Sequence, residues 1–118
     1  MTRKRHSKHV SDRNRFSIIQ PDMSKCFICG GIASEKHEIF NGGGFRQRSK
    51  DWGMVIGLCS TCHRNVTENI EPRLRIKQMG QIFFEAKYGH AKYMEVFKKN
   101  YLDEETWNEL QRDGMASE

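Results

Sequence analysis

Apolar residues are distributed differently in the two halves of the chain. In the first half they form short runs bounded by glycine and polar residues, which is the pattern of short strands. We expect one strand over residues 35–40 and a second over residues 54–58. Between them, the sequence Asn-Gly-Gly-Gly at 41–44 predicts a loop, and residues 45–52 predict an irregular stretch or one helical turn.

Helical spacing governs the second half. A short helix is expected to start at His63 and to end before Pro72. Two apolar stripes then recur at the spacing of one helix face, and both are expected to form core. They comprise Leu74, Ile76, Met79, Ile82, Phe83 and Ala86, followed by Tyr93, Met94, Val96, Phe97 and Tyr101. The sequence Tyr-Gly-His at 88–90 predicts the stop between them, and residues 103–112 predict a short acidic helix. The pattern as a whole predicts an α+β fold with a helical C-terminal extension.

The length of 118 residues corresponds to one small domain, which we divide into three parts. Residues 1–20 lack periodicity and are expected to form a flexible basic arm. Residues 21–72 are expected to form the core, and residues 73–118 a helical extension packed on it. The net charge of +5 is uneven, since residues 1–20 carry six basic residues and one acidic residue. This asymmetry favours a polyanionic partner over a merely solvated tail.

Cellular location is limited by hydropathy. No apolar run approaches the roughly 20 residues that a membrane-spanning helix needs. No apolar signal segment is seen at the N-terminus. We therefore expect no membrane partner and a location in a reducing cytoplasm.

All four cysteines fall in two tight pairs, Cys26 with Cys29 and Cys59 with Cys62. Two C-x-x-C units at this separation can close on one tetrahedral zinc ion. A metal staple suits a domain with a limited core. Two disulfides are the less favoured alternative, because they need an oxidising compartment. Such a zinc site says little about function by itself, because similar sites also act as inert folding staples.

Two histidines accompany the cysteine pairs. His37 lies between the pairs and His63 directly follows Cys62. The zinc site needs neither histidine, so both are candidates for chemistry. The alternatives are a hydrogen-bonded strand histidine at 37, and at 63 a spare zinc ligand or a solvent-facing residue.

The order of a strand with histidine, a loop, a second strand, Cys-x-x-Cys-His and a helix resembles the HNH endonucleases, or ββα-metal nucleases, of the small phage type. The resemblance covers about residues 25–102. Its segments are His37-Glu38-Ile39-Phe40-Asn41-Gly42-Gly43, Arg46-Gln47-Arg48-Ser49 with Gly53, and Leu58-Cys59 to His63. The chain departs from the family at two places. Glu38 stands where the family has a histidine base, and the family's asparagine is absent near Met54.

The resemblance implies a metal-dependent DNA endonuclease, encoded by a phage or prophage and acting in the cytoplasm of a bacterial host cell. It implies catalytic roles for His37, Glu38 and His63. It also implies Mg²⁺ or another divalent metal, held by His37, His63 and Asn65, in addition to the structural zinc at the cysteines. The third ligand is open among Glu38, Asn65, Asn69 and Glu71.

The chemistry of hydrolysis bears on these roles, because it needs an activated water and a cation on the phosphate. An imidazole with a pKa near 6.5 is a better base near neutral pH than a carboxylate near 4.3, which favours His37 as base. Alignment on Ile39 instead places Glu38 at the base position and His37 at the metal position. Both assignments stay open. The candidates for phosphate contacts are Arg46, Arg48, Lys50 and Arg64, which otherwise form a solvated face.

Two other functions remain in view. One is a zinc-knuckle DNA-binding protein whose nuclease site has decayed. The other is an accessory component of a phage packaging or recombination assembly. The expected partners are therefore DNA and, for the last function, other proteins of that assembly.

Overall fold

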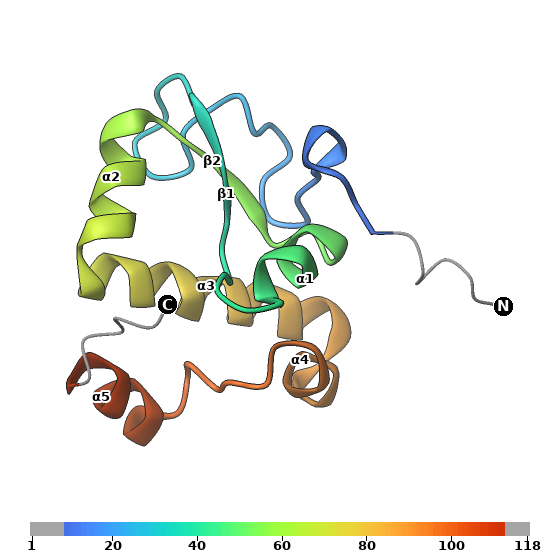
Figure 1. Cartoon of the computed structure of the whole chain (residues 1–118), viewed down its shortest axis with the longest axis vertical. Coiled ribbons are helices and arrows are strands. Elements are labelled where there is room, and N and C mark those ends of the chain that lie inside the picture. The colour runs from blue at the N-terminus through green and yellow to red at the C-terminus, as the bar shows by residue number, and fades with distance from the viewer. Residues whose placement is uncertain (1–8, 113–118) are drawn as a thin grey trace, which may run out of the picture.

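A computed structural model describes residues 9–112 of the chain (Figure 1). In chain order its elements are the 3₁₀ turn η2 (Asp12–Asn14), β1 (Glu35–Glu38), α1 (Phe45–Asp51), β2 (Val55–Leu58), α2 (Ser60–Glu68), α3 (Ile70–Tyr88), α4 (His90–Phe97) and α5 (Glu104–Arg112). The two antiparallel strands and five helices of this part of the chain confirm the α+β class. Across residues 9–112, no helix combines the length and the hydropathy that crossing a membrane requires.

β1 and β2 pair antiparallel, with Glu35 opposite Leu58 and Glu38 opposite Val55. β2 is buried along its whole length, as its unbroken apolar sequence predicts. Both strands were expected and are present, although β1 is shorter than expected. β1 ends before Phe40 because that residue bonds to Ser49 instead of to β2. The Phe40 N–H donates to Ser49 Oγ at 2.9 Å, and the Ser49 hydroxyl donates to the Phe40 carbonyl at 2.6 Å.

α1 is more regular than the sequence predicts, since its seven residues make about two helical turns. Ser49 lies within α1, is fully buried, and forms hydrogen bonds with the backbone of Phe40. These contacts hold α1 against the end of β1. Gly53, with a φ of 73°, then turns the chain into β2.

The short helix expected to start at His63 and to end before Pro72 is present as α2, which begins earlier, at Ser60, and ends at Glu68. α2 and α3 are separated only by Asn69, which has an extended backbone (φ −120°, ψ 133°). Pro72 lies in the first turn of α3, where its missing N–H would have had no intrahelical partner. The predicted stop near residue 89 is confirmed, because α3 ends at Gly89 with a φ of 92°.

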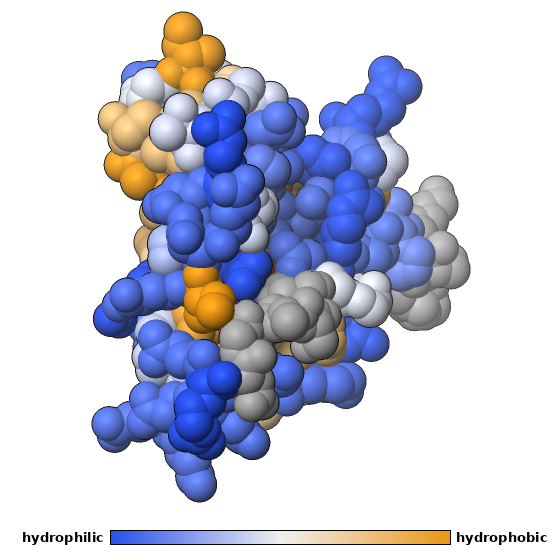
Figure 2. Space-filling model, turned by 60° about the vertical axis from the view of Figure 1, so that its left-hand side comes forward, coloured by the Kyte–Doolittle hydropathy of each residue, from blue (hydrophilic) through white to orange (hydrophobic). Residues whose placement is uncertain are grey.

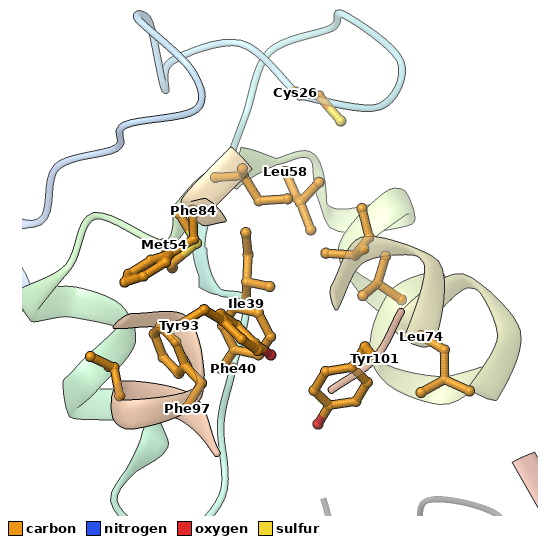
Figure 3. Close-up of a cluster of buried hydrophobic side chains, with 14 residues drawn as sticks. Cys26, Ile39, Phe40, Met54, Leu58, Leu74, Phe84, Tyr93, Phe97 and Tyr101 are labelled. Atoms are coloured by element: carbon orange, nitrogen blue, oxygen red, sulfur yellow. The ribbon is translucent and has the colours of Figure 1, made fainter. Parts of the chain in front are cut away.

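An aromatic cluster joins the sheet to the C-terminal helices (Figure 3). Phe40 packs on Phe97 with ring centroids 4.4 Å apart, and Phe84 meets the same ring edge-on at 5.6 Å. α3 passes close to the strand end, since a Cβ atom on Gly80 would lie 3.0 Å from Ile39. α3 also contacts α2, α4 and α5. One core therefore serves both the half of the chain that carries the cysteines and the helical extension.

The segment assigned to the basic arm lies only partly within the described residues. Residues 1–8 are outside them. Residues 9–20 lie against the domain, in contrast to the expected free arm. The Ile18 N–H donates to the Gly53 carbonyl at 3.0 Å, and the side chains of Phe16 and Ile18 cover Gly53 closely. These apolar contacts explain why this part of the segment is folded.

Candidate metal centre and histidine pair

Four cysteine thiols meet at one end of the sheet. Cys26 and Cys29 come from the turn before β1, and Cys59 and Cys62 from the start of α2. All four sulfurs lie within 4.8 Å of one another, and Cys29 Sγ is 3.8 Å from Cys59 Sγ. Tetrahedral zinc with Zn–S bonds of ~2.3 Å sets its sulfurs about 3.8 Å apart. The cysteines are free thiols rather than disulfides, and their arrangement is compatible with the predicted zinc site.

Each cysteine pair is shaped by its own backbone. The N–H of Cys29 faces Cys26 Sγ at 3.5 Å, and the N–H of Cys62 faces Cys59 Sγ at 3.4 Å. Gly30, with a φ of 82°, closes the first turn by donating to the Cys26 carbonyl at 2.9 Å. Cys59 closes the second turn as the N-cap of α2. Both turns therefore present two sulfurs and N–H donors to one point.

The ionisation of the thiols is uneven. Burial disfavours the Cys26 thiolate, but backbone N–H groups led by that of Cys29 outweigh it and lower the pKa of Cys26 to about 6. Hydrogen bonding to Cys59, together with burial, raises the pKa of Cys62 to about 12. Neighbouring thiolates repel one another, so all four ionise together only around a cation. Binding of zinc at these cysteines would therefore be coupled to proton release.

The first cysteine turn is fixed to the outer edge of β2. The Phe27 N–H donates to the Gly57 carbonyl at 2.8 Å, and the Gly57 N–H donates to Gln20 Oε1 at 2.8 Å. A Cβ atom on Gly57 would overlap the Met23 carbonyl oxygen. Only glycine allows the chain to pass so close to the strand at this point.

His37 and His63 form a pair beside the cysteine cluster. His37 is on β1 and His63 is in the first turn of α2, directly after Cys62. Their ring centroids are 5.3 Å apart, with the planes at 73°. Burial, and then the positive charges of His63 and Lys77, lower the pKa of His37 to about 4. His37 is therefore a neutral imidazole near pH 7, able to coordinate a metal or accept a proton.

Glu38 is not part of this histidine pair. Consecutive strand residues point to opposite faces, so Glu38 lies on the other side of β1 from His37. Its buried carboxylate is 2.9 Å from Arg15 Nε and 3.4 Å from Arg46 Nε. The structure thus ties the predicted catalytic glutamate to two arginines.

The other candidates for a third metal ligand also lie elsewhere. Asn65 is two positions, or about 200°, around α2 from His63. Its side-chain oxygen accepts a hydrogen bond from Asn69 at 2.8 Å, with both residues exposed. Glu71 pairs with Arg75 at 3.4 Å. Among residues 9–112, the four cysteines are the only group of three or more histidine, cysteine or acidic side chains placed to hold a metal.

The four predicted phosphate-binding residues divide into two sets. Arg46 and Arg64 are exposed. Arg48 donates to a backbone carbonyl of α4 at 2.8 Å, and the Lys50 ammonium is buried 2.6 Å from Asp12. Arg48 and Lys50 therefore have internal partners.

Three polar residues near these groups are not identified by the sequence reasoning. Lys77 is buried near His37, and its position follows from the buried face of α3 on which Leu74 and Gln81 also lie. Asp12 and Arg15 fall in the segment assigned to the arm. No local motif identifies either of them.

The surface around the cysteines is partly apolar. Ile28 and Ile32 are 48% and 87% exposed on the first cysteine turn, and Figure 2 shows apolar surface at that end of the molecule. A shallow hollow of about 560 Å³ lies along β1 rather than over the histidine pair. Its lining includes Arg15, Ser34 and Lys36.

Comparison with known proteins adds no relative. No protein family model matches the chain, and no curated protein or solved structure matches it significantly.

Proposed function

We propose that this protein is a metal-dependent DNA endonuclease of the HNH type. The observation that carries the proposal is the pair of His37 and His63, with ring centroids 5.3 Å apart beside the four-cysteine cluster. Two strands followed by a helix bring these histidines together, and the second strand leads through the cysteines into that helix. The order of elements and residues is the one on which the resemblance to the HNH endonucleases rests.

The cysteine cluster has a structural role in this proposal. Zinc bound there ties the turn at residues 26–29 to the start of α2. His63 directly follows Cys62, so the zinc also sets the position of the His63 ring.

The catalytic cation belongs to the histidine pair. When bound, such an ion polarises the scissile phosphate. Two imidazoles suit Mn²⁺, Ni²⁺ or Zn²⁺ better than Mg²⁺, which prefers oxygen ligands. The described residues bring only these two protein ligands together, so water and the DNA phosphate have to supply the rest.

The depressed pKa of His37 bears on its role. A base with a pKa of about 4 is poorly matched to proton transfer near neutral pH. A neutral imidazole is, however, the form that binds a metal. The role of metal ligand therefore suits His37 better than the role of general base.

Nicking of supercoiled plasmid by zinc-loaded protein tests the proposal. We expect nicking with Mn²⁺ or Ni²⁺ to exceed that with Mg²⁺. His37→Ala and His63→Ala should each lower the rate by about 100-fold or more, since each removes a proposed ligand of the catalytic metal. His90→Ala is the matched control, because His90 is exposed and pairs with Glu85 instead. The proposal fails if the folded wild type nicks with none of these metals, or if folded His37→Ala nicks at the wild-type rate.

A DNA-binding protein without nuclease activity is the second candidate, whether it acts alone or in a phage packaging or recombination assembly. Two observations favour it. The predicted third ligands Glu38 and Asn65 are turned away from the histidine pair. The positive charge of Lys77, which acts on His37, opposes a cation there. DNA binding that persists while no tested metal supports nicking would select this function.

A further inference from the structure

One carboxylate oxygen on the N-terminal segment faces three cationic side chains. Asp12 Oδ1 lies 2.6 Å from Lys50 Nζ, 3.4 Å from Arg15 Nη2 and 3.5 Å from Arg46 Nη2. The hydrogen bond from Lys50 is the main reason that the pKa of Asp12 falls to about 2. Asp12 is therefore ionised at every pH at which the protein is expected to act.

Two of the three cations have an acidic partner other than Asp12. Arg15 and Arg46 each direct Nε to the buried Glu38 and Nη2 to Asp12. Lys50 belongs to α1, and its side chain is only 7% exposed. Glu38 balances one of the three positive charges, so two remain for Asp12 and solvent. Asp12 itself is 57% exposed on a short 3₁₀ turn, which makes it the replaceable member of the group.

We propose that Arg15, Arg46 and Lys50 form a binding site for a phosphate group of DNA, and that Asp12 occupies this site in the free protein. Carboxylate and phosphate are recognised by the same guanidinium and ammonium donors. The site rests on the proposed function for the identity of its ligand as DNA. That it takes a phosphate follows from its charges and donors alone.

A second observation places the site on a path for a polyanion. Arg15 also lines the hollow of about 560 Å³ along β1. The same hollow is lined by Lys36, by the hydroxyl-bearing Ser24 and Ser34, and by one acidic residue, Glu35. Cationic and hydroxyl groups are the usual partners of a nucleic-acid backbone. A strand lying in this hollow would reach the site through Arg15.

The competing explanation is that Asp12 only anchors the N-terminal segment. Asp51 provides a matched control for this explanation. It holds the same segment through the Val10 N–H at 2.8 Å and His9 at 2.7 Å, and no ion pair joins it to Arg15, Arg46 or Lys50. Asp12→Asn and Asp51→Asn change the net charge equally, and both loosen the segment. Only Asp12→Asn removes the negative charge that faces Arg15, Arg46 and Lys50.

The test is the affinity of zinc-loaded protein for a fluorescent DNA duplex at low salt without added divalent metal. We expect Asp12→Asn to bind about five- to tenfold more tightly than wild type, because it exposes charge-assisted donors. Asp51→Asn should stay within about twofold, because it removes one charge that lies outside the proposed site. Adding Arg46→Gln to Asp12→Asn should remove the gain. Equal affinities of the two aspartate variants, or weaker binding by folded Asp12→Asn, would overturn the site.

Inorganic phosphate separates this inference from the nuclease proposal. We expect phosphate to raise the melting temperature of Asp12→Asn more than that of wild type or Asp51→Asn, relative to chloride at equal ionic strength. If phosphate has this effect in a protein that never nicks DNA, the phosphate site is supported and the nuclease proposal is rejected. No phosphate response and unchanged DNA affinity of Asp12→Asn, in a protein that nicks, would reject the site alone.

Discussion

His37 is an ionisable residue held in a neutral state by its surroundings. The residue is only 6% exposed, and the positive charges of His63 and Lys77 act on it. Its pKa is about 4 in the folded protein, against about 6.5 for an unfolded chain. Between these values the unfolded chain binds a proton that the folded protein does not bind. Stability is therefore lost as the pH falls from about 6.5 towards 4.

We expect His37→Gln to weaken this pH dependence. Lowering the pH from 7 to 5 should cost wild type on the order of 2 kcal/mol of unfolding free energy through His37, and the variant should not lose this part. Urea unfolding of zinc-loaded protein at both pH values measures the difference. Because thiol protonation affects both proteins alike, parallel losses would show that His37 is not the responsible group.

At the residue scale, the sequence predicts the cysteine cluster well because each C-x-x-C turn is a local structure. Cys62 carries His63 with it, and His37 lies on the face of β1 that meets α2. The alternation of side chains along a strand, which the sequence already implied, weighs against a shared catalytic role for Glu38 and His37. In a strand, the side chain of Glu38 has to point away from that of His37. The position of Lys77 near His37 depends on how α3 packs against the sheet, and only tertiary packing determines this.

β2 shows how one strand can have both edges occupied in a two-stranded sheet. One edge pairs with β1, and residues 20–27 run along the other. The carbonyl of Met23 lies where a side chain at 57 would begin. Gly57 is thus the position at which the first cysteine turn depends on β2.

Gly57→Ala should disrupt this contact. We expect its unfolding free energy to fall by about 2 kcal/mol or more, because buried backbone has to move to admit the methyl group. Gly44→Ala is the control, since a Cβ atom there meets nothing within 4 Å and its φ is −89°. Chemical denaturation of both variants tests this, and equal stabilities would contradict the close approach of residues 20–27 to β2.

At the element scale, periodicity predicts the strands and the C-terminal helices but not every boundary. α1 depends on the bond between Ser49 and Phe40, two residues whose contact no local pattern reveals. Pro72 suggests a break between helices, but a proline is tolerated in the first helical turn. Whether Pro72 breaks a helix or starts one depends on where α3 begins, and it begins at Ile70.

The zinc site should stabilise the molecule as a whole. Cys59→Ser keeps a hydroxyl at the N-cap of α2 and removes one thiolate, so its effect reports on the metal rather than the cap. We expect weaker zinc binding and a loss of about 3 kcal/mol or more in unfolding free energy. Metal analysis and circular dichroism melting measure these quantities, with the exposed Ser60→Ala as control. One zinc per chain and an unchanged melting curve for Cys59→Ser would contradict the prediction.

Two truncations separate charge from folding at the N-terminus. Residues 1–8 carry four basic residues and no acidic residue. Removing them should lower the log–log salt slope of DNA binding by at most roughly 3.6, without loss of stability. Removing residues 1–20 should also lower the melting temperature, because Ile18 and Arg15 contact the core. Equal melting temperatures of the two truncated proteins would refute the packing of residues 9–20.

α3 determines how the protein can be divided. The predicted boundary between residues 72 and 73 falls inside its first turn, and the same helix covers Ile39 and contacts α2, α4 and α5. The segment at residues 26–65, on which the proposed nuclease function rests, therefore does not form an independent folding unit. If this segment were moved into another protein without α3 and α4, the apolar side chains of Ile39 and Phe40 would be exposed. Recombination between genes would preserve the segment only if it exchanged the helices together with it.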